Sequence, residues 1–440
     1  MKQINGYSKL TKEQKIDWLG ENYFNGDENV KQELLSYWHE DASVQKTFDD
    51  FSENTLTNMY MPYGVAPNFL INNEWYCLPM AIEESSVVAA MANAGKFWSE
   101  RGGFHTEVLG TTKIGQVHFT FKGDKETFKN NFPFLKAELP EGSKYLTVNM
   151  DARGGGVLDV ELVDMTEYIE DYYQLKVSFE TCDAMGANFI NSVLEEYANQ
   201  LKEFVVKKNL PGELKIILSI VSNYTPDCLV RAWVECKIED LGVVGGLPPH
   251  EFAEKVRMAV KIAEVDPHRA TTHNKGVFNG VDAVIIATGN DFRAVEACGH
   301  TYASRSGRYS GLTHCTLEEG VFKFWIDLPL AVGTVGGLTQ LHPLVKRSLQ
   351  ILGNPDAKQL MQFAAVAGLA QNFGALRALT TVGIQQGHMK MHLLNILNYL
   401  KATEEEKNHA LEYFKDKIVS FTTSRVLLEQ LRSSKNKVQK

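Results

Sequence analysis

Four short segments of the chain combine small residues with polar side chains that could take part in catalysis. The first places the adjacent acids Glu83 and Glu84 directly before an Ala-rich run. Acids at the start of a helix most often serve only to favour its positive end. If one of them donates a proton instead, a neighbouring group must raise its pKa. Spacing alone leaves both interpretations open.

The second and third segments follow each other closely. Residues 266–276, followed by Asn279, set Lys275 among His, Asn, Thr and Gly, which is unlike a solvated surface lysine. The alternative is a loop whose Asn and Thr side chains cap backbone groups. Residues 288–291 end in Asp291 after an apolar run, and loops at strand ends often carry catalytic groups. Asp291 could equally be the N-cap of the next helix, and the spacing slightly favours that role.

The fourth segment, residues 383–392, contains two histidines. His388 and His392 are four apart, a separation at which two imidazoles on a helix can share a metal. No glutamate lies between them and no third ligand is near in sequence, so we predict no metal site. A single histidine that donates a proton near neutral pH is the better functional interpretation.

Two glycine-containing stretches could approach phosphates. Residues 333–339 lack both the GxGxxG spacing of a Rossmann turn and the lysine of a P-loop. Residues 183–188 open a long amphipathic segment with small residues, and such a helix start can bring backbone N–H groups close to a pyrophosphate. Either stretch could instead serve only close packing.

The elements that must position these segments follow from the apolar pattern. We expect strands at 114–121, 157–162, 175–179 and 214–221, with a long helix after Asp183, which together suggest a compact α+β domain inserted into a larger one. In the larger domain we expect helices at 85–98, 251–265, from 292 and at 356–380, and a strand at 282–287. The first 50 residues predict a helical arm, and the chain beyond Gly387 predicts a charged helical tail.

Composition excludes several classes of protein. Hydrophobic residues make up 44% and charged residues 22%, which is typical of globular chains rather than disordered ones. The net charge of −9 gives no overall basic field for nucleic acid or an anionic membrane. No apolar run approaches the ~20 residues that span a bilayer, and the start lacks the apolar core of a secretory signal. Six widely spaced cysteines without a CxxC pair favour a reducing cytoplasm.

Seven segments, in order between about residues 50 and 395, resemble the hydroxymethylglutaryl-CoA (HMG-CoA) reductase family, and specifically its soluble class II form of prokaryotes. They are PMAIEESSVVAA (79–90), DAMGAN (183–188), DPHRATTHNKGVFNG (266–280), ATGNDFRA (287–294), GTVGGLT (333–339), GLAQNFGALRAL (368–379) and GIQQGHMKMH (383–392).

The resemblance implies an enzyme that reduces HMG-CoA to mevalonate and free CoA with two molecules of NADPH or NADH, and with no metal. It implies that Lys275 stabilises the oxyanion of the thioester, Glu84 donates a proton in the aldehyde step, and Asp291 supports both. It implies that His388 protonates the departing thiolate. Lys275, Glu84 and Asp291 would then form one coupled, buried network.

The resemblance also implies the architecture and the binding residues. A large HMG-CoA-binding domain (1–109 and 223–380, with the helical arm) would carry an inserted ferredoxin-like NAD(P)-binding domain (110–222) and a mobile C-terminal helical flap (381–440) with His388. The expected active unit is a homodimer, alone or within a higher oligomer of dimers, with no membrane or nucleic-acid partner. The residues implied to bind substrate are Arg269, Asn279, Gln371 and Ser85. Those implied to bind the cofactor are Asp183, Met185, Gly186, Ala187, Asn188, Asn223, Gly336 and Gly337.

Three positions depart from the family pattern. Residues 53–57 read ENTLT, with Thr57 where the family commonly has glycine, Ser85 replaces a proline, and Leu338 stands where glycine or alanine is usual. None of these removes a catalytic group. They keep open the alternative of a non-catalytic relative that binds CoA or a nucleotide. The lack of a Rossmann fingerprint counts against a third alternative, an ordinary alcohol dehydrogenase.

Overall fold

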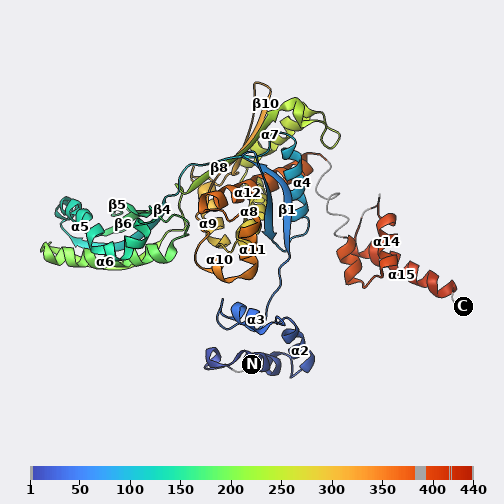
Figure 1. Cartoon of the computed structure of the whole chain (residues 1–440), viewed down its shortest axis with the longest axis horizontal. Coiled ribbons are helices and arrows are strands. Elements are labelled where there is room, and N and C mark those ends of the chain that lie inside the picture. Colours follow the sequence, from blue (N-terminus) through green and yellow to red (C-terminus); the bar gives the residue numbers. More distant parts are fainter. Residues whose placement is uncertain (1–2, 382–392, 416, 418, 439–440) are drawn as a thin grey trace.

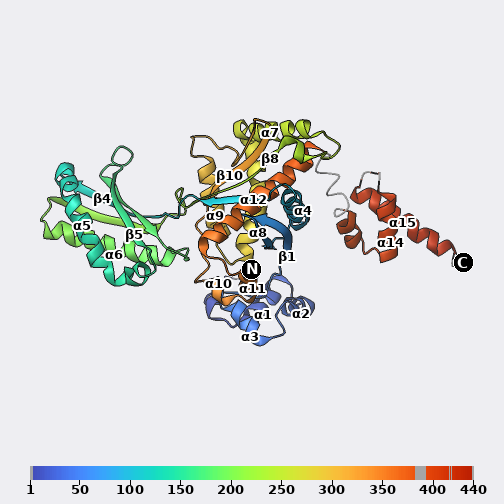
Figure 2. The ribbon, with the colours of Figure 1, turned by 45° about the horizontal axis from the view of Figure 1, so that its top comes forward.

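The computed structural model describes residues 3–381, 393–415, 417 and 419–438 (Figure 1). A central body carries a small unit on one side and a C-terminal helical unit on the opposite side, as Figures 1 and 2 both show. Each of these three parts has its own cluster of buried hydrophobic side chains.

The central body combines strands and helices. Its strands are β1 (Tyr63–Ile71), β2 (Glu74–Ala81), β3 (His105–Val108), β8 (Leu229–Lys237), β9 (Thr313–Glu318) and β10 (Val321–Pro329). Its helices are α4 (Val87–Ser99), α7 (Pro249–Val265), α8 (Pro267–Ala287), α9 (Phe292–Ala303), α10 (Leu338–Leu341), α11 (Pro343–Ile351) and α12 (Ala357–Thr380), with the 3-10 turn η2 (Ile238–Leu241). Strands β1 and β2 form a hairpin, and β3-β8-β10-β9 form an antiparallel sheet.

Helices α8 and α12 cross at the centre of this body. Most of α12 is buried, which confirms the buried helix expected at 356–380. The two helices approach closely at Gly280, where a Cβ atom would lie 2.3 Å from the backbone oxygen of Ala367. Because of this approach, α8 and the residues it carries are held firmly against the core.

The strand predicted at 282–287 is wrong, because those residues form the last turns of α8. A short apolar run looks the same in a buried strand and in a buried helix, and its β-branched residues favoured the strand. Helix α8 begins 15 residues earlier, where the Asp266 side chain accepts a hydrogen bond from the His268 N–H (2.9 Å) and Pro267 occupies the first helical position. Residues 267–276, which include Lys275, are therefore helical rather than a loop.

The small unit confirms the α+β pattern predicted for residues 110–222. Its elements are β4 (Lys113–Gly123), α5 (Lys125–Asp151), β5 (Gly156–Asp164), β6 (Tyr172–Glu180), α6 (Ala187–Lys207) and β7 (Gly212–Val221). The sheet is antiparallel in the order β5-β6-β4-β7, which gives a βαββαβ unit. Helix α5 was not predicted, because it contains Pro133 and Pro140, which normally interrupt a helix.

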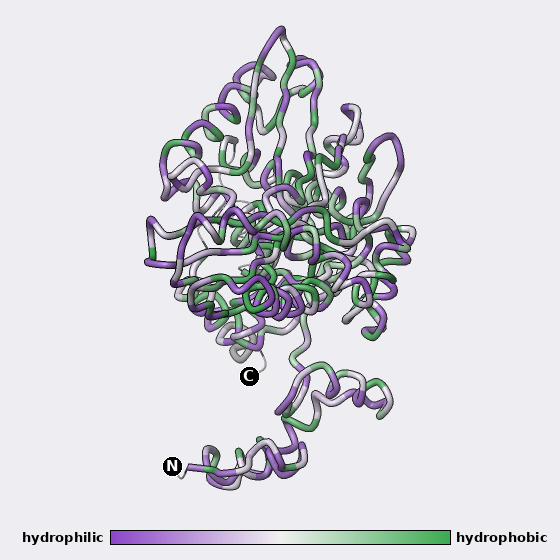
Figure 3. The backbone as a smooth tube through the Cα atoms, turned by 90° about the vertical axis from the view of Figure 1, so that its left-hand side faces the viewer, coloured by the Kyte–Doolittle hydropathy of each residue, from purple (hydrophilic) through white to green (hydrophobic). Residues whose placement is uncertain are grey.

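The N-terminal arm is helical, as predicted. It consists of η1 (Tyr7–Lys9), α1 (Lys12–Tyr23), α2 (Glu28–Ser36) and α3 (Ala42–Asp49), and it stands off from the body in Figure 3. The ring of His342 joins the two parts by packing against Phe48 and stacking on Phe51, with ring centroids 5.3 and 5.6 Å away.

The C-terminal unit contains α14 (Glu404–Tyr413) and α15 (Phe421–Val438), so the described part of the tail is helical, as expected. His388 and His392 lie outside the described residues. Among the helices that the structure describes, none has the length and apolar character needed to cross a bilayer.

Candidate active site

Three of the predicted residues meet in one place. Lys275, on α8, forms an ion pair with Glu84 in the loop between β2 and α4. Asn279, one turn further along α8, donates a hydrogen bond from Nδ2 to the same Glu84 oxygen, Oε2, at 3.3 Å. The two charged side chains are 58% and 40% exposed, so a ligand can reach them from solvent.

The local sequence explains this arrangement. Lys275 and Asn279 are four apart, and that spacing places them on the same face of α8. Glu84 lies just before Ser86, whose left-handed backbone (φ 72°) turns the chain into α4. The paired acids therefore lie in the loop that enters α4, and the one at 84 faces the lysine.

Asp291 has a different set of contacts. Its side chain caps α9 by accepting hydrogen bonds from the N–H groups of Arg293 (3.0 Å) and Ala294 (3.2 Å), so the N-cap interpretation is confirmed. Its other oxygen pairs with the Arg293 guanidinium at 3.1 Å. Within the described residues of one chain, Lys275 therefore has one carboxylate partner and is half exposed, in contrast to the expected ammonium buried between two acids.

The polar residues just before Lys275 are structural. His273 is buried and shares a 2.5 Å hydrogen bond with the Thr313 hydroxyl, which itself donates to Asn372 Oδ1 at 3.1 Å. Asn274 is buried and donates to the backbone oxygen of Ser310. These contacts fix α8 against the core. The residues of this motif that remain available for catalysis are therefore those with exposed side chains, such as Lys275.

Burial of His273 predicts a pH dependence of stability. Burial, and secondarily the positive charge of Arg269, lower the pKa of His273 to about 3. Its Nδ1 has no hydrogen-bond partner in the described structure, so a proton there would gain no acceptor. The unfolded chain binds that proton below pH ~6.5 and the folded chain does not. Stability should therefore be complete above pH ~6.5 and fall at lower pH by up to about 1.4 kcal/mol per pH unit.

This dependence can be measured by chemical denaturation at pH 7.5 and 5.0. In His273→Gln, the loss of unfolding free energy between these two values should be smaller than in the wild type by about 2 kcal/mol. An equal loss in both proteins would contradict the assignment.

Two predicted substrate residues have unsatisfied polar groups. Arg269 is half-buried, burial lowers its pKa, and no carboxylate of the described residues lies within ion-pair distance. The Oε1 atom of Gln371 is buried without a hydrogen-bond partner in the described structure, and its Cβ lies against Gly280, beside Asn279. An anionic group and a hydrogen-bond donor of a ligand would satisfy them. Ser85 is exposed next to Glu84.

The predicted cofactor segment opens α6. Gly186, the N-cap residue of this 21-residue helix, has a left-handed backbone (φ +91°) and no side chain with which to cap it. The first N–H groups of α6 are thus available to an anion. Met185 and Asn223, two further cofactor candidates, line one small cavity together with Lys113.

The other cofactor candidates flank this region. Gly336 and Gly337 have positive φ angles (82° and 54°) directly before α10, and no atom of the described residues crowds either of them. Leu338 follows them as the partly exposed first residue of α10. The Asp183 carboxylate accepts a hydrogen bond from the Ala357 N–H at 2.9 Å, an interaction that sequence reasoning did not anticipate.

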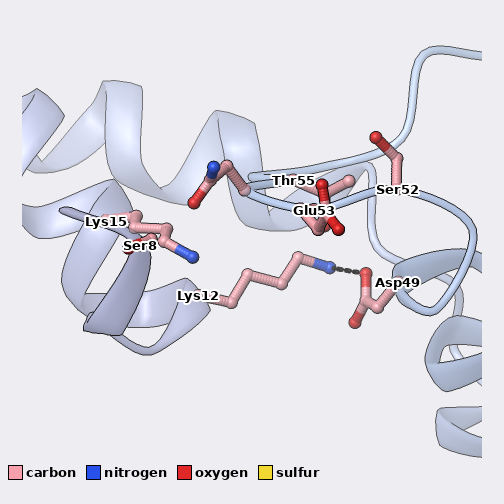
Figure 4. Close-up of a pocket in the computed structure, with 8 residues that line it drawn as sticks. Ser8, Lys12, Lys15, Asp49, Ser52, Glu53 and Thr55 are labelled. Atoms are coloured by element: carbon pink, nitrogen blue, oxygen red, sulfur yellow. Dashed lines mark hydrogen bonds and ion pairs between the residues drawn. The ribbon is translucent and has the colours of Figure 1, made fainter. Parts of the chain in front are cut away.

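A separate cavity of about 540 Å³ lies in the N-terminal arm (Figure 4). Lys12 spans it and pairs with Asp49 at 2.6 Å between Nζ and Oδ1. Three residues of the ENTLT segment, 53–55, line its wall. Thr57 lies beyond it and donates a hydrogen bond to the backbone oxygen of Leu34 (2.7 Å).

The described residues contain no group of three or more His, Cys, Asp or Glu side chains placed to hold a metal ion. All six cysteines are free thiols.

Comparisons with known proteins identify the relatives of this chain. A family model described as hydroxymethylglutaryl-coenzyme A reductase matches residues 13–393. The chain is 37% identical over 432 residues to the 3-hydroxy-3-methylglutaryl-coenzyme A reductase of Archaeoglobus fulgidus, covering 98% of this chain and 95% of that protein.

Solved structures agree with this result. The class II reductase of Streptococcus pneumoniae bound to NADPH in open conformations superposes with a TM-score of 0.71 at 36% identity, covering 86% of this chain and 100% of that one. A second structure of the Streptococcus pneumoniae reductase has the same TM-score and identity and covers 98% of this chain and 100% of that one.

Proposed function

The chain belongs to the hydroxymethylglutaryl-coenzyme A reductase family, and on that basis we propose that it reduces HMG-CoA to mevalonate and CoA. Each turnover consumes two molecules of NADPH or NADH and two protons, because a thioester must accept four electrons to become an alcohol. The observation that carries this proposal is the Lys275–Glu84 ion pair, with Asn279 bonded to the same carboxylate and the lysine side chain about half exposed.

Lys275 stabilises the charge that develops on the carbonyl oxygen. Hydride addition to the thioester carbon places negative charge on this oxygen, and an ammonium held beside it lowers the barrier. The ion pair to Glu84 and the rigid seating of α8 against α12 hold Lys275 in position before substrate binds.

Two residues move protons. His388 protonates the CoA thiolate as it leaves, which prevents the thiolate from adding back to the aldehyde. In its protonated form, Glu84 supplies the proton for the aldehyde step: the Lys275 ammonium gives a proton to the carbonyl oxygen and takes one from Glu84. Asp291 supports this pair as a third charged group once the complete site is assembled.

Arg269 pairs with the free carboxylate of the glutaryl group, for which its half-buried guanidinium, without an ion pair among the described residues, is suited. Asn279, Gln371 and Ser85 contribute hydrogen bonds to the rest of the acyl group.

The segment of Asp183 and residues 185–188, with Asn223 and the glycines at 336 and 337, binds the cofactor within a ferredoxin-like domain. When bound, the reduced nicotinamide supplies the hydride in both steps. The N-terminal end of α6 would hold the pyrophosphate, since its N-cap residue, Gly186, has no side chain to occupy the first N–H groups.

A homodimer is the active unit in this proposal. The half-exposed Lys275 and the separate position of Asp291 in one chain are consistent with a site that a second subunit completes. Closure by residues 381–440 would bring His388 to the thioester.

Purified protein should oxidise NADPH or NADH only when HMG-CoA is present, with two coenzyme molecules oxidised per CoA thiol released. Initial rates with each coenzyme at matched concentration would establish the preferred one. Tight binding of HMG-CoA without turnover would instead identify a non-catalytic relative and overturn the proposal.

A further inference from the structure

The cofactor segment is bonded to the central body through its backbone. The carbonyl oxygen of Asp183 accepts hydrogen bonds from the N–H groups of Thr334 (2.8 Å) and Val335 (3.3 Å). Ala184 and Val335 form a short parallel bridge. Gly333 allows this approach, because a Cβ at that position would lie 2.5 Å from the backbone nitrogen of Met185.

The side chain of Asp183 extends this contact to helix α12 of the central body. Its Oδ1 accepts the N–H of Ala357, the first residue of α12, at 2.9 Å. A carboxylate at a helix start is favoured by the helix dipole and satisfies an N–H that has no partner within the helix. The same helix packs on α8, which carries Lys275, and itself carries Gln371.

A second connection runs from the same loop to the turn before α9. Asn290 accepts the N–H of Gly333 at 2.8 Å and directly precedes Asp291, the N-cap of α9. The cofactor segment, the 333–335 loop, the Asp291 turn and the start of α12 thus form one hydrogen-bonded junction between the small unit and the body.

We propose that Asp183 is a positioning residue, which fixes the cofactor segment relative to α12 through the Ala357 N–H rather than by touching the cofactor. This inference rests on the proposed function and gives one of its cofactor residues a different role. Held in this way, Met185 and the start of α6 keep a constant position with respect to the helices that carry the substrate residues.

The experiment removes either partner of the hydrogen bond. Asp183→Ala removes the acceptor. Ala357→Pro removes the donor and should be tolerated, because proline suits the first helical position and Asp356 before it is extended (ψ 174°). Each variant should weaken NADPH binding, measured by calorimetry, by roughly three- to tenfold, the size of a lost helix cap. The double variant should be no weaker than either single one. The KM for HMG-CoA should stay near the wild-type value.

Lys125→Pro is the matched control. It also places proline at the first position of a helix, α5, but in the small unit and away from the junction, so NADPH binding should not change. Wild-type affinity in Ala357→Pro, with weakened binding in Asp183→Ala alone, would mean that Asp183 contacts the cofactor directly and would overturn the inference. Wild-type protein that binds NADPH but does not turn over HMG-CoA would overturn the proposed function only, since the binding comparison does not depend on turnover.

Discussion

Replacing Lys275 by methionine should lower kcat for HMG-CoA reduction by roughly 10²–10³-fold or more. Methionine preserves the length and much of the packing of lysine but provides no charge at the carbonyl oxygen. Because the ammonium acts mainly on charge that appears in the transition state, the KM for HMG-CoA should change far less than kcat. Steady-state kinetics with saturating coenzyme would separate these two quantities.

Lys255→Met provides the control for this variant. Lys255 is exposed on α7 and pairs with Glu251 at 3.2 Å, so its loss removes a surface ion pair of the same kind without touching the site. Its kcat should equal that of the wild type.

Glu84→Gln tests the other half of the pair and should slow the aldehyde step more than thioester reduction. Full activity in Lys275→Met would exclude the proposed mechanism, although the family assignment would stand.

The small unit was largely predictable from the sequence. Its strands alternate apolar and polar residues, and the stripe through Val193, Tyr197 and Leu201 on α6 repeats every four residues. Both patterns arise because one face of each element is buried against a single core. The exception is α5, where tertiary packing retains two prolines within one helix.

The central body was harder to predict, because its main elements are buried on several sides. The apolar residues at the end of α8 carry no period that separates a helix from a strand. The sequence also could not distinguish exposed polar residues from buried ones within the same motif. Judged by residue type and position in the motif, His273 and Asn274 are candidates for the active site just as Lys275 is. Only the fold shows that their side chains form hydrogen bonds within the core.

The pairing of Glu84 with Lys275 came from the resemblance, since the two residues are 191 apart and no local rule connects them. The bond between Asp183 and Ala357 had no sequence signal at all. It joins two segments 174 residues apart, and an aspartate before a helix start already has a simple local explanation.

Gly280→Ala should destabilise the central body by at least about 2 kcal/mol, although alanine is normally the better helix residue. The added Cβ would lie 2.3 Å from the backbone oxygen of Ala367 and 2.8 Å from the Cβ of Gln371. Backbone atoms of a buried helix cannot move aside alone, so α8 and α12 must separate. This separation also displaces Gln371 relative to Asn279, so kcat should fall together with the melting temperature.

Gly276→Ala is the comparison that isolates this effect. It lies one turn earlier on α8, and its new Cβ would meet only ordinary contacts, the nearest being Asn372 Nδ2 at 3.6 Å. Alanine there should therefore leave the melting temperature unchanged or raise it, by the ~0.5–1 kcal/mol by which alanine exceeds glycine in a helix. If Gly280→Ala were as stable as Gly276→Ala, the close crossing of α8 and α12 could not be what holds Lys275 in place.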